Sequence, residues 1–386
     1  MRAERNMTAR VAFVDIYNRI PICSGGDWWV FQLLADLSRN NNVSAFYTSE
    51  RGCAEGYEPA GIVYTTRFLK SRIDWKRISK WLETFRPDFL FDKSQIRDIG
   101  ADLVFTLIYG YHISSYIAKK NSAPIILVMH NVEWQYVKSM HSLWYVPTRA
   151  LENAILRKVD AIITISPQDY DYAVKFASRE RVFYIPPQPD AQIFNPDGNR
   201  HDFGSDLFNV LFYGSLDRYQ NQVALAFIQD ELIPALAGYG LNDTIKVHVF
   251  GSGKMPEALL TGSDINFIGA VRDPGYYIRG ADVVIVPIKN PSGIKLRAIE
   301  SLACGKPVVA TPEAAQGLPE GLKAMLYVAD TAAGFAEVLK GIYDGTLPNK
   351  TNPSVVLRLA QGDTAEAVKE YVLTGERKKA THVESL

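Results

Sequence analysis

Three charged side chains follow a glycine-containing loop in the last third of the chain: Lys295, Arg297 and Glu300. Lys295 and Arg297 lie where a helix is predicted to begin, and a helix start leaves backbone N–H groups unpaired and carries partial positive charge. Two cations there oppose the helix dipole unless an anion binds beside them. A carboxylate further along the helix can accept hydrogen bonds from two vicinal ribose hydroxyls. Together the three residues predict a site for the diphosphate and the ribose of a nucleotide.

The elements that position these side chains follow from the hydrophobic pattern. The apolar, β-branched run from Val283 to Val286 predicts a buried strand that ends at Pro287, because proline cannot donate to a strand ladder. Residues 290–293 predict a loop and 294–303 a helix with one apolar face. Residues 308–311 predict the next strand. The unit is strand, glycine loop, helix and strand; an ordinary crossover with solvated charges is the alternative.

Helical spacing limits how the two cations act together. At about 100° per residue, positions 295 and 297 differ by about 200°, so both cannot face one side of a helix. Either Lys295 is still in the loop, or one of the two cations is structural. Arg297 also lies three residues before Glu300, so an ion pair within the helix is the alternative for Arg297.

The segment that ends in the sequence GKPVVAT resembles the nucleotide-sugar loop of the retaining GT-B glycosyltransferases, the "glycosyl transferases group 1" family. Glu300 matches the second of a glutamate pair that many members carry, whereas the first falls at Ser292 and is missing. A subgroup with G-x-[RK]-x-[KR] before the last glutamate fits Gly293, Lys295 and Arg297. The resemblance implies donor binding by Gly293, Lys295 and Glu300, and charge stabilisation of the leaving diphosphate by Lys295 and Arg297.

In the first half of the chain, a predicted strand at 125–129 leads directly into His130-Asn131-Val132-Glu133, which resembles the family pattern H-[ND]-x-E. Open parallel sheets bind ligands at the carboxyl ends of their strands, where His130 falls. The resemblance implies a catalytic position for His130 beside the donor sugar. It also implies acceptor-side positions for Asn131 and Glu133, and for the glycine pair Gly25-Gly26 that follows the first predicted strand.

In the second half, the strand predicted at 209–213 is followed by Gly214, where the family has a glycine turn that approaches the donor. A basic residue on the donor phosphates normally comes next. No lysine occupies the usual place in this chain, and Arg218 is the nearest candidate. The resemblance therefore adds Gly214 and Arg218 to the predicted donor site.

Predicted strands alternate with helices in both halves, which is typical of α/β domains with parallel sheets. The segment PPQPDAQIFNPDG is rich in proline and Asx residues and suits a linker, with the boundary near Pro189. We predict an N-terminal, acceptor-side Rossmann-like domain at 1–188 and a C-terminal, nucleotide-sugar-binding domain at 189–345. Helices in 346–386 are expected to pack back toward the first domain, before a frayed tail. The resemblance implies the GT-B fold, with two facing, doubly wound domains and a cleft between them.

Composition excludes several other classes. Among 386 residues, 42 basic side chains balance 42 acidic ones, which gives no indication of nucleic-acid binding. Three cysteines argue against a disulfide scaffold and for a reducing compartment. Neither a zinc-ligand spacing nor an Asp-x-Asp motif is present, so we predict no metal and no other cofactor. Without a signal peptide or a long apolar run, the expected location is cytoplasmic.

A basic, aromatic segment at 67–86 predicts contact with an anionic membrane surface. It contains seven cations, two acids and the aromatic residues Trp75, Trp81 and Phe85. Interfacial helices combine basic residues with tryptophan in this way. The alternative is a helix whose aromatic face packs on the domain core while its cations are solvated. The expectation is a cytoplasmic protein that binds peripherally at the inner membrane face.

The predicted function is transfer of a sugar, with retention, from a nucleotide-diphosphate sugar to an acceptor hydroxyl of a glycan, a lipid-linked molecule or a natural product. This makes the chain a hexosyl- or other glycosyltransferase. Two alternatives stay open: a GT-B nucleotide-sugar epimerase, and a non-catalytic nucleotide-sugar-binding protein. A NAD-linked dehydrogenase is disfavoured because no predicted strand leads into G-x-G-x-x-G with a downstream ribose acid.

Overall fold

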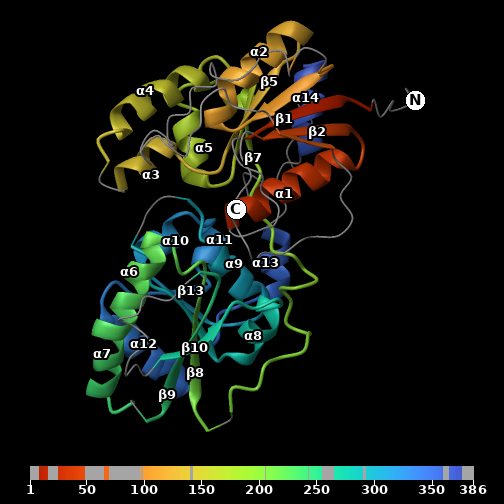
Figure 1. The fold of residues 1–386 in the computed structure, drawn as a ribbon. Coiled ribbons are helices and arrows are strands. Elements are labelled where there is room, and N and C mark those ends of the chain that lie inside the picture. The colour runs from red at the N-terminus through yellow and green to blue at the C-terminus, as the bar shows by residue number, and fades with distance from the viewer. Residues whose placement is uncertain are drawn as a thin grey trace. The chain divides into compact units, whose positions relative to one another are not determined.

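The computed structural model describes residues 8–15, 25–47, 65–68, 96, 99–139, 142–204, 206–241, 243–253, 265–289, 293–359 and 365–375. The chain forms two compact units (Figure 1). The first comprises Met1–Ile185 and Gly362–Val383, and the second comprises Pro186–Gln361. Each has its own parallel sheet, so the prediction of two doubly wound α/β domains is confirmed.

Among the described residues, the sheet of the first unit has seven parallel strands in the order β3-β2-β1-β4-β5-β6-β7. The chain winds outward from β1 to β3 and then crosses to the other side of β1. This reversal places a topological switch point between β1 and β4, where open α/β sheets bind ligands. The strands are β1 Arg10–Val14, β2 Asn42–Tyr47, β3 Thr65–Phe68, β4 Leu103–Thr106, β5 Ile125–Met129, β6 Ala161–Thr164 and β7 Val182–Tyr184.

The core of the first unit joins the sheet to its helices. Val104 of β4 and Leu127 of β5 lie in one buried cluster with Ile117 and Ile155 from two of the helices. Strands that are apolar on both faces need such cover from helices, which explains their continuous Val, Ile and Leu runs. The helices are α1 Gly25–Ser38, η5 Ile108–Gly110, α2 Tyr111–Asn121, α3 Glu133–Ser139, α4 Tyr145–Leu156, α5 Pro167–Ala173, η6 Arg179–Arg181 and α14 Ala365–Thr374.

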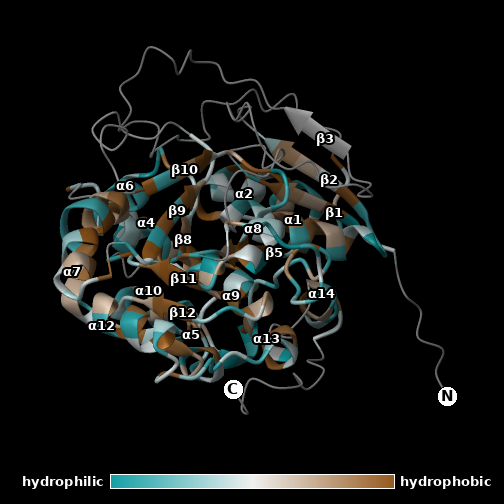
Figure 2. Ribbon diagram, turned by 90° about the horizontal axis from the view of Figure 1, so that it is seen from below, coloured by the Kyte–Doolittle hydropathy of each residue, from teal (hydrophilic) through white to brown (hydrophobic). Residues whose placement is uncertain are grey.

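The sheet of the second unit repeats this winding. Among the described residues, six parallel strands run in the order β10-β9-β8-β11-β12-β13, with the switch point between β8 and β11. Figure 2 shows β8, β9 and β12 largely in the brown of hydrophobic residues. The strands are β8 Phe208–Tyr213, β9 Ile245–Phe250, β10 Ile265–Gly269, β11 Val283–Val286, β12 Val308–Ala310 and β13 Leu326–Val328.

The helices of the second unit connect these strands. They are α6 Tyr219–Phe227, η7 Ile228–Leu232, α7 Ile233–Gly238, α8 Pro274–Gly280, α9 Leu296–Ala303, α10 Pro312–Gln316, α11 Glu320–Lys323, α12 Ala332–Tyr343 and α13 Pro353–Leu359. Of the helices in the C-terminal stretch, α13 packs on α9 within the second unit, whereas α14 packs on α1 within the first.

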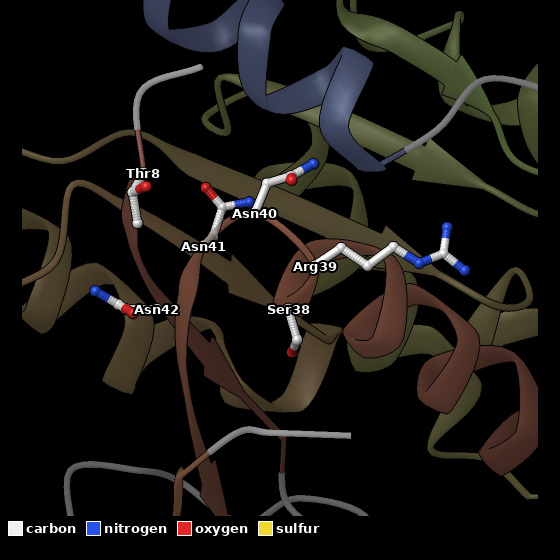
Figure 3. Close-up of a pocket in the computed structure, with 6 residues that line it drawn as sticks. All are labelled: Thr8, Ser38, Arg39, Asn40, Asn41 and Asn42. Atoms are coloured by element: carbon white, nitrogen blue, oxygen red, sulfur yellow. The ribbon is translucent and has the colours of Figure 1, made fainter. Parts of the chain in front are cut away.

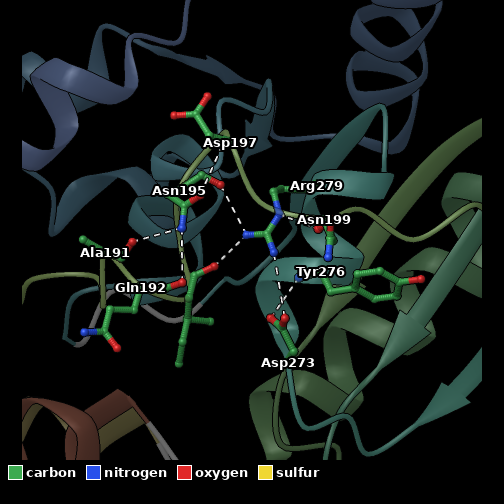
Figure 4. A network of polar contacts seen from close by, with 9 residues as sticks. Ala191, Gln192, Asn195, Asp197, Asn199, Asp273, Tyr276 and Arg279 are labelled. Carbon is green, nitrogen blue, oxygen red and sulfur yellow. Dashed lines mark hydrogen bonds and ion pairs between the residues drawn. The ribbon is translucent and has the colours of Figure 1, made fainter.

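One buried arginine anchors the proline-rich stretch that begins the second unit (Figure 4). Arg279 of α8 is only 6% exposed. Its guanidinium donates to the carbonyl oxygens of Ile193, Asn195 and Asn199 at 2.7–3.3 Å. Asp273 lies 3.8 Å from the same group. Because a buried cation needs hydrogen-bond partners, these carbonyls and Arg279 stabilise one another and fix the linker on α8.

Candidate functional site

The candidate donor site begins where β8 and β9 end, at Gly214 and Gly251. The two turns are so close that a Cβ added at Gly251 would lie 1.7 Å from the carbonyl oxygen of Gly214. The amide of Gly214 donates to the carbonyl of Phe250, and the amide of Leu216 donates to that of Ser252. Both glycines have positive φ. Only residues without a side chain fit here, because the two turns and the side chains beside them pack directly against each other.

Arg297 of α9 extends its guanidinium over the end of β8. A Cβ added at Gly214 would lie 2.6 Å from Nη2 of Arg297, and Nη2 donates to Oδ1 of Asn221 at 2.9 Å. The guanidinium also lies over the ring of Phe212 at 5.1 Å. Nη1 is buried and, among the described residues, has no hydrogen-bond partner. Since buried donors are nearly always paired, this atom stands out as unsatisfied among the described residues.

The structure resolves the spacing of the two predicted cations. α9 begins at Leu296, two residues later than predicted, and Lys295 precedes it as the N-cap residue with non-helical dihedral angles. Lys295 is therefore in the loop, and its Nζ donates to the carbonyl of Gly293 at 2.9 Å. Among the ion pairs of the described residues, none joins Arg297 to Glu300. The two charges still attract each other within the helix, but without a direct ion pair.

Glu300 is held by a tyrosine at the last position of β8. The hydroxyl of Tyr213 donates to Oε2 of Glu300 at 2.9 Å and lies 3.0 Å from the carbonyl oxygen of Arg297. Burial raises the pKa of Glu300 to about 7, while Tyr213 and Arg297 oppose that rise. Burial also lowers the pKa of Arg297. One α9 turn thus carries a cation and a carboxylate that both lie beside the end of β8.

Arg218, the nearest candidate for the missing phosphate-binding lysine, is exposed and forms the N-cap of α6 without a side-chain cap bond. The residue that lies beside Gly214 is Asn221, which is 3% exposed and donates to the carbonyl of Ser215 at 2.7 Å. Oδ1 of Asn221 also accepts the hydrogen bond from Nη2 of Arg297. The cation at this turn therefore comes from α9, which is distant in sequence but adjacent across the switch point.

In the first unit, His130 and Asn131 directly follow β5 and are half-buried. Glu133 begins α3, is 8% exposed and accepts a hydrogen bond from the hydroxyl of Tyr109 at 2.8 Å. The backbone N–H groups of Glu133 and Trp134 donate to the carboxyl group of Glu152. The predicted acceptor-side carboxylate is thus engaged within its own unit.

Glu152 is the most buried carboxyl group of this cluster, at 1% exposure. Burial raises its pKa to about 8, and the charge of nearby Glu133 acts in the same direction. Glu152 lies on α4, nineteen residues after the peptide group that it accepts from. It therefore holds the backbone that follows His130 in one position.

Gly25 and Gly26, which the resemblance places on the acceptor side, form the first turn of α1. Ser292 and residues 69–86, which carry the basic membrane prediction, lie outside the described residues. In the part of the chain that the structure describes, no helix is long and apolar enough to cross a bilayer, and no group of three or more His, Cys, Asp or Glu could hold a metal ion.

An open polar recess of about 320 Å³ lies elsewhere in the first unit, near the start of β2 (Figure 3). Asn41 is buried beside it and bonds the amide of Ala9, the carbonyl of Leu37 and the side chains of Glu366 and Lys369. These bonds tie α14 to the β1–β2 region. The recess is thus explained by packing, and its lining residues are Thr8, Ser38, Arg39, Asn40, Asn41 and Asn42.

Sequence reasoning missed four residues that organise the two strand ends: Tyr109, Glu152, Tyr213 and Asn221. Tyr213 had a usable signal, because a hydroxyl ends an otherwise apolar strand directly before a glycine turn. Asn221, Tyr109 and Glu152 had none, because each acts on a residue far away in sequence.

Two family models match this chain. The model described as "Glycosyltransferase Family 4" matches residues 24–191, and the model described as "Glycosyl transferases group 1" matches residues 208–344. The D-inositol 3-phosphate glycosyltransferase of Arthrobacter sp. (strain FB24) is 25% identical over 240 residues. That alignment covers 57% of each protein, so the chain spans little more than half of this relative.

Solved structures share the fold over nearly the whole chain. Anabaena HepE, in complex with UDP and glucose, superposes with a TM-score of 0.65 at 13% identity and covers 98% of this chain and 100% of its own. Sucrose-phosphate synthase from Thermosynechococcus elongatus gives 0.62 at 18% identity, with 95% of each chain covered. From these matches and the two Rossmann-like units, the chain has the GT-B fold, and its two halves each match a glycosyltransferase family model.

Proposed function

We propose that this enzyme transfers a sugar from a UDP-sugar to an acceptor hydroxyl with retention of configuration. The observation that carries the proposal is Arg297, whose guanidinium lies beside Gly214 at the switch point of the second unit and whose Nη1 is buried without a partner among the described residues. A diphosphate supplies the acceptor oxygens that such a guanidinium binds best. UDP is the proposed nucleotide because HepE, which shares the fold, binds UDP and UDP-glucose.

The diphosphate is proposed to lie between Arg297 and the glycine turns, with Lys295 above it from the loop. As the glycosidic bond breaks, negative charge develops on the leaving diphosphate. Fixed cations and backbone N–H groups that face this charge stabilise the transition state without reorganising. Arg297 is already held in place by Asn221 and by the ring of Phe212. It thus replaces, from another helix, the lysine that the family pattern has near Arg218.

The ribose is proposed to bind Glu300 through its two hydroxyls. Both oxygens of an ionised carboxylate accept hydrogen bonds. Oε2 of Glu300 accepts one from the hydroxyl of Tyr213 at 2.9 Å. Tyr213 therefore orients Glu300 from the strand beneath. Binding of ribose favours the ionised carboxylate over the protonated form that burial promotes.

The acceptor side is proposed to be the first unit. His130, at the end of β5, is the residue that we propose to act on the transferred sugar, with Asn131 near the acceptor. In a retaining transfer of this type, a donor phosphate oxygen takes the proton of the acceptor hydroxyl. A paired-carboxylate glycosidase mechanism is not required.

For the acceptor, we propose a polyol or sugar hydroxyl, free or lipid-linked. The name of the Arthrobacter relative points to a phosphorylated polyol. We also propose that the enzyme acts in the cytoplasm at the inner membrane face. It is proposed to need no metal.

The experiment is incubation of the purified enzyme with a panel of UDP-, GDP- and dTDP-sugars, with and without inositol phosphates and simple glycosides. We expect UDP release that depends on an acceptor, and a glycoside whose anomeric configuration by NMR matches that of the donor. An epimerase would instead convert the donor sugar without an acceptor. Donor binding with neither release nor conversion across the panel would make the chain a binding protein and refute transfer.

A further inference from the structure

The first unit exposes an apolar tip between α3 and α4. Leu143 is 85% exposed and Val146 is 57% exposed, the highest values among the exposed large hydrophobic side chains of the first unit that the structure describes. Pro147 beside them is also exposed. Single exposed apolar residues are ordinary, but adjacent ones at a projecting turn indicate a contact surface.

The tip rests on a firmly built base. α3 and α4 pack side by side in the first unit (Figure 1). Beneath the tip, the rings of Trp134 and Tyr145 lie 6.4 Å apart, and Glu152 bonds the start of α3. The apolar side chains are therefore presented by a fixed helical hairpin.

The charged side chains close to the tip in sequence have one sign. The sequence from Trp134 to Leu151 contains no Asp or Glu, and its cations include Lys138 and Arg149. Lys138 lies 5.7 Å from the ring of Tyr145, and Arg149 lies 4.9 Å from the ring of Trp134. The flanking acids Glu133 and Glu152 are buried and so do not offset these cations at the surface.

We propose that this tip, residues 142–149, docks on an anionic lipid surface. Leu143 and Val146 would enter the boundary between headgroups and acyl chains, where Trp144 and Tyr145 are also favoured. Lys138 and Arg149 would meet lipid phosphates. Exposed apolar residues flanked only by cations complement such a surface, whereas a protein partner would have to supply the acids itself. The inference uses no residue of the donor site.

The test is sedimentation of the full chain with acceptor-free vesicles of phosphatidylcholine alone or with 30% phosphatidylglycerol. The variants are L143S/V146S and K138E/R149E, with V328S/L373S as a matched control, since Val328 and Leu373 are also exposed apolar residues. Each test variant should lose at least about tenfold in binding to anionic vesicles, and the control less than twofold. High salt should weaken binding by the wild type.

Thermal unfolding and UDP affinity of every variant verify that it is folded. The proposal is overturned if the wild type does not bind anionic vesicles at low salt, or if L143S/V146S binds as well as the wild type. Binding that persists in both test variants but disappears when Lys70, Arg72, Lys76 and Arg77 are reversed would assign the contact to 67–86 instead. A change of oligomeric state in L143S/V146S without lipid, and no vesicle binding, would make the tip an interface between copies.

Discussion

The two strand ends that carry the candidate site differ in how far the chain satisfies its own polar groups. At the end of β8, Arg297 keeps a buried Nη1 without a partner among the described residues. After β5, Glu133 accepts from Tyr109, and the backbone N–H groups that begin α3 bond to Glu152. The second unit therefore keeps an unused donor, whereas the carboxylates of the first unit are engaged by groups of that unit.

This difference separates a group that binds from groups that position. A buried cation with one unsatisfied donor gains free energy when an anion binds, so replacing it should weaken ligand binding and turnover most. A satisfied carboxyl group stabilises the fold, and its removal should act first on stability. The variants below test that division, from the largest expected effect to the smallest.

Replacement of Arg297 by methionine, which keeps most of its volume, should reduce kcat/KM about 10²–10³-fold, because a preorganised charge on the leaving diphosphate is lost. Arg218→Ala is the matched control, since it removes an exposed cation close in sequence to the same turn. Its kcat/KM should change less than about threefold. Initial rates of UDP release give both values, and a larger loss in the Arg218 variant would contradict the assignment.

Glu300→Ala should weaken UDP binding about 10–100-fold, because hydrogen bonds to a charged group are lost. In the wild type the pKa of Glu300 is about 7, so affinity should rise with pH by up to about tenfold per unit below 7 and then level off. Tyr213→Phe should reduce affinity at pH 7 about threefold to tenfold. It should also move this midpoint upward, since the Tyr213 hydrogen bond lowers the pKa of Glu300.

Calorimetric titrations with UDP from pH 5.5 to 8.5 measure these changes. A Tyr213→Phe protein with weaker binding but an unmoved midpoint would mean that the tyrosine only supports packing.

At the β5 end, Glu152→Ala should lower the free energy of unfolding by about 1–3 kcal/mol, because it leaves buried N–H groups of α3 unpaired. Glu152→Gln should be milder at neutral pH. The pKa of Glu152 is raised to about 8, so its contribution to stability is fully present below about pH 4.5 and is lost as pH rises through 8. Urea denaturation of the wild type and Glu152→Gln should therefore diverge between pH 5 and 8.5, with the glutamine variant less dependent on pH. Parallel curves would show that Glu152 does not titrate in this range.

Chelation should have the smallest effect. Since cations of the chain are proposed to neutralise the diphosphate, activity should survive EDTA within about twofold. A complete loss that magnesium or manganese restores would show that the site needs a metal.

Local sequence patterns predicted most of the strands and helices, and they placed some of the candidate site residues on these elements. Val283–Val286 and Ile125–Met129 were predictable because buried parallel strands are short, apolar and β-branched. Lys295, Arg297 and Glu300 were predicted from the same logic, since a helix after a glycine loop is a local feature, whereas Gly214 was implied by the family resemblance.

What could not be predicted depends on contacts across the sheet. Arg297 reaches Asn221, which is 76 residues away in sequence, and Tyr213 reaches Glu300 over 87 residues. Arg218 was predicted from its proximity in sequence, whereas the strand order brings Arg297 to the turn at Gly214. The start of α9 was placed two residues too early for a related reason: Lys295 is bonded back to the loop at Gly293.

The measurement that tests the central claim most directly is calorimetric titration of UDP into the wild type, Arg297→Met and Arg218→Ala under identical conditions. We predict saturable binding to the wild type, an affinity within threefold of it for Arg218→Ala, and a loss of at least about thirtyfold for Arg297→Met, in keeping with a buried charge-assisted contact. Equal affinity of the wild type and a folded Arg297→Met protein would contradict the proposal that the buried guanidinium beside Gly214 holds the diphosphate.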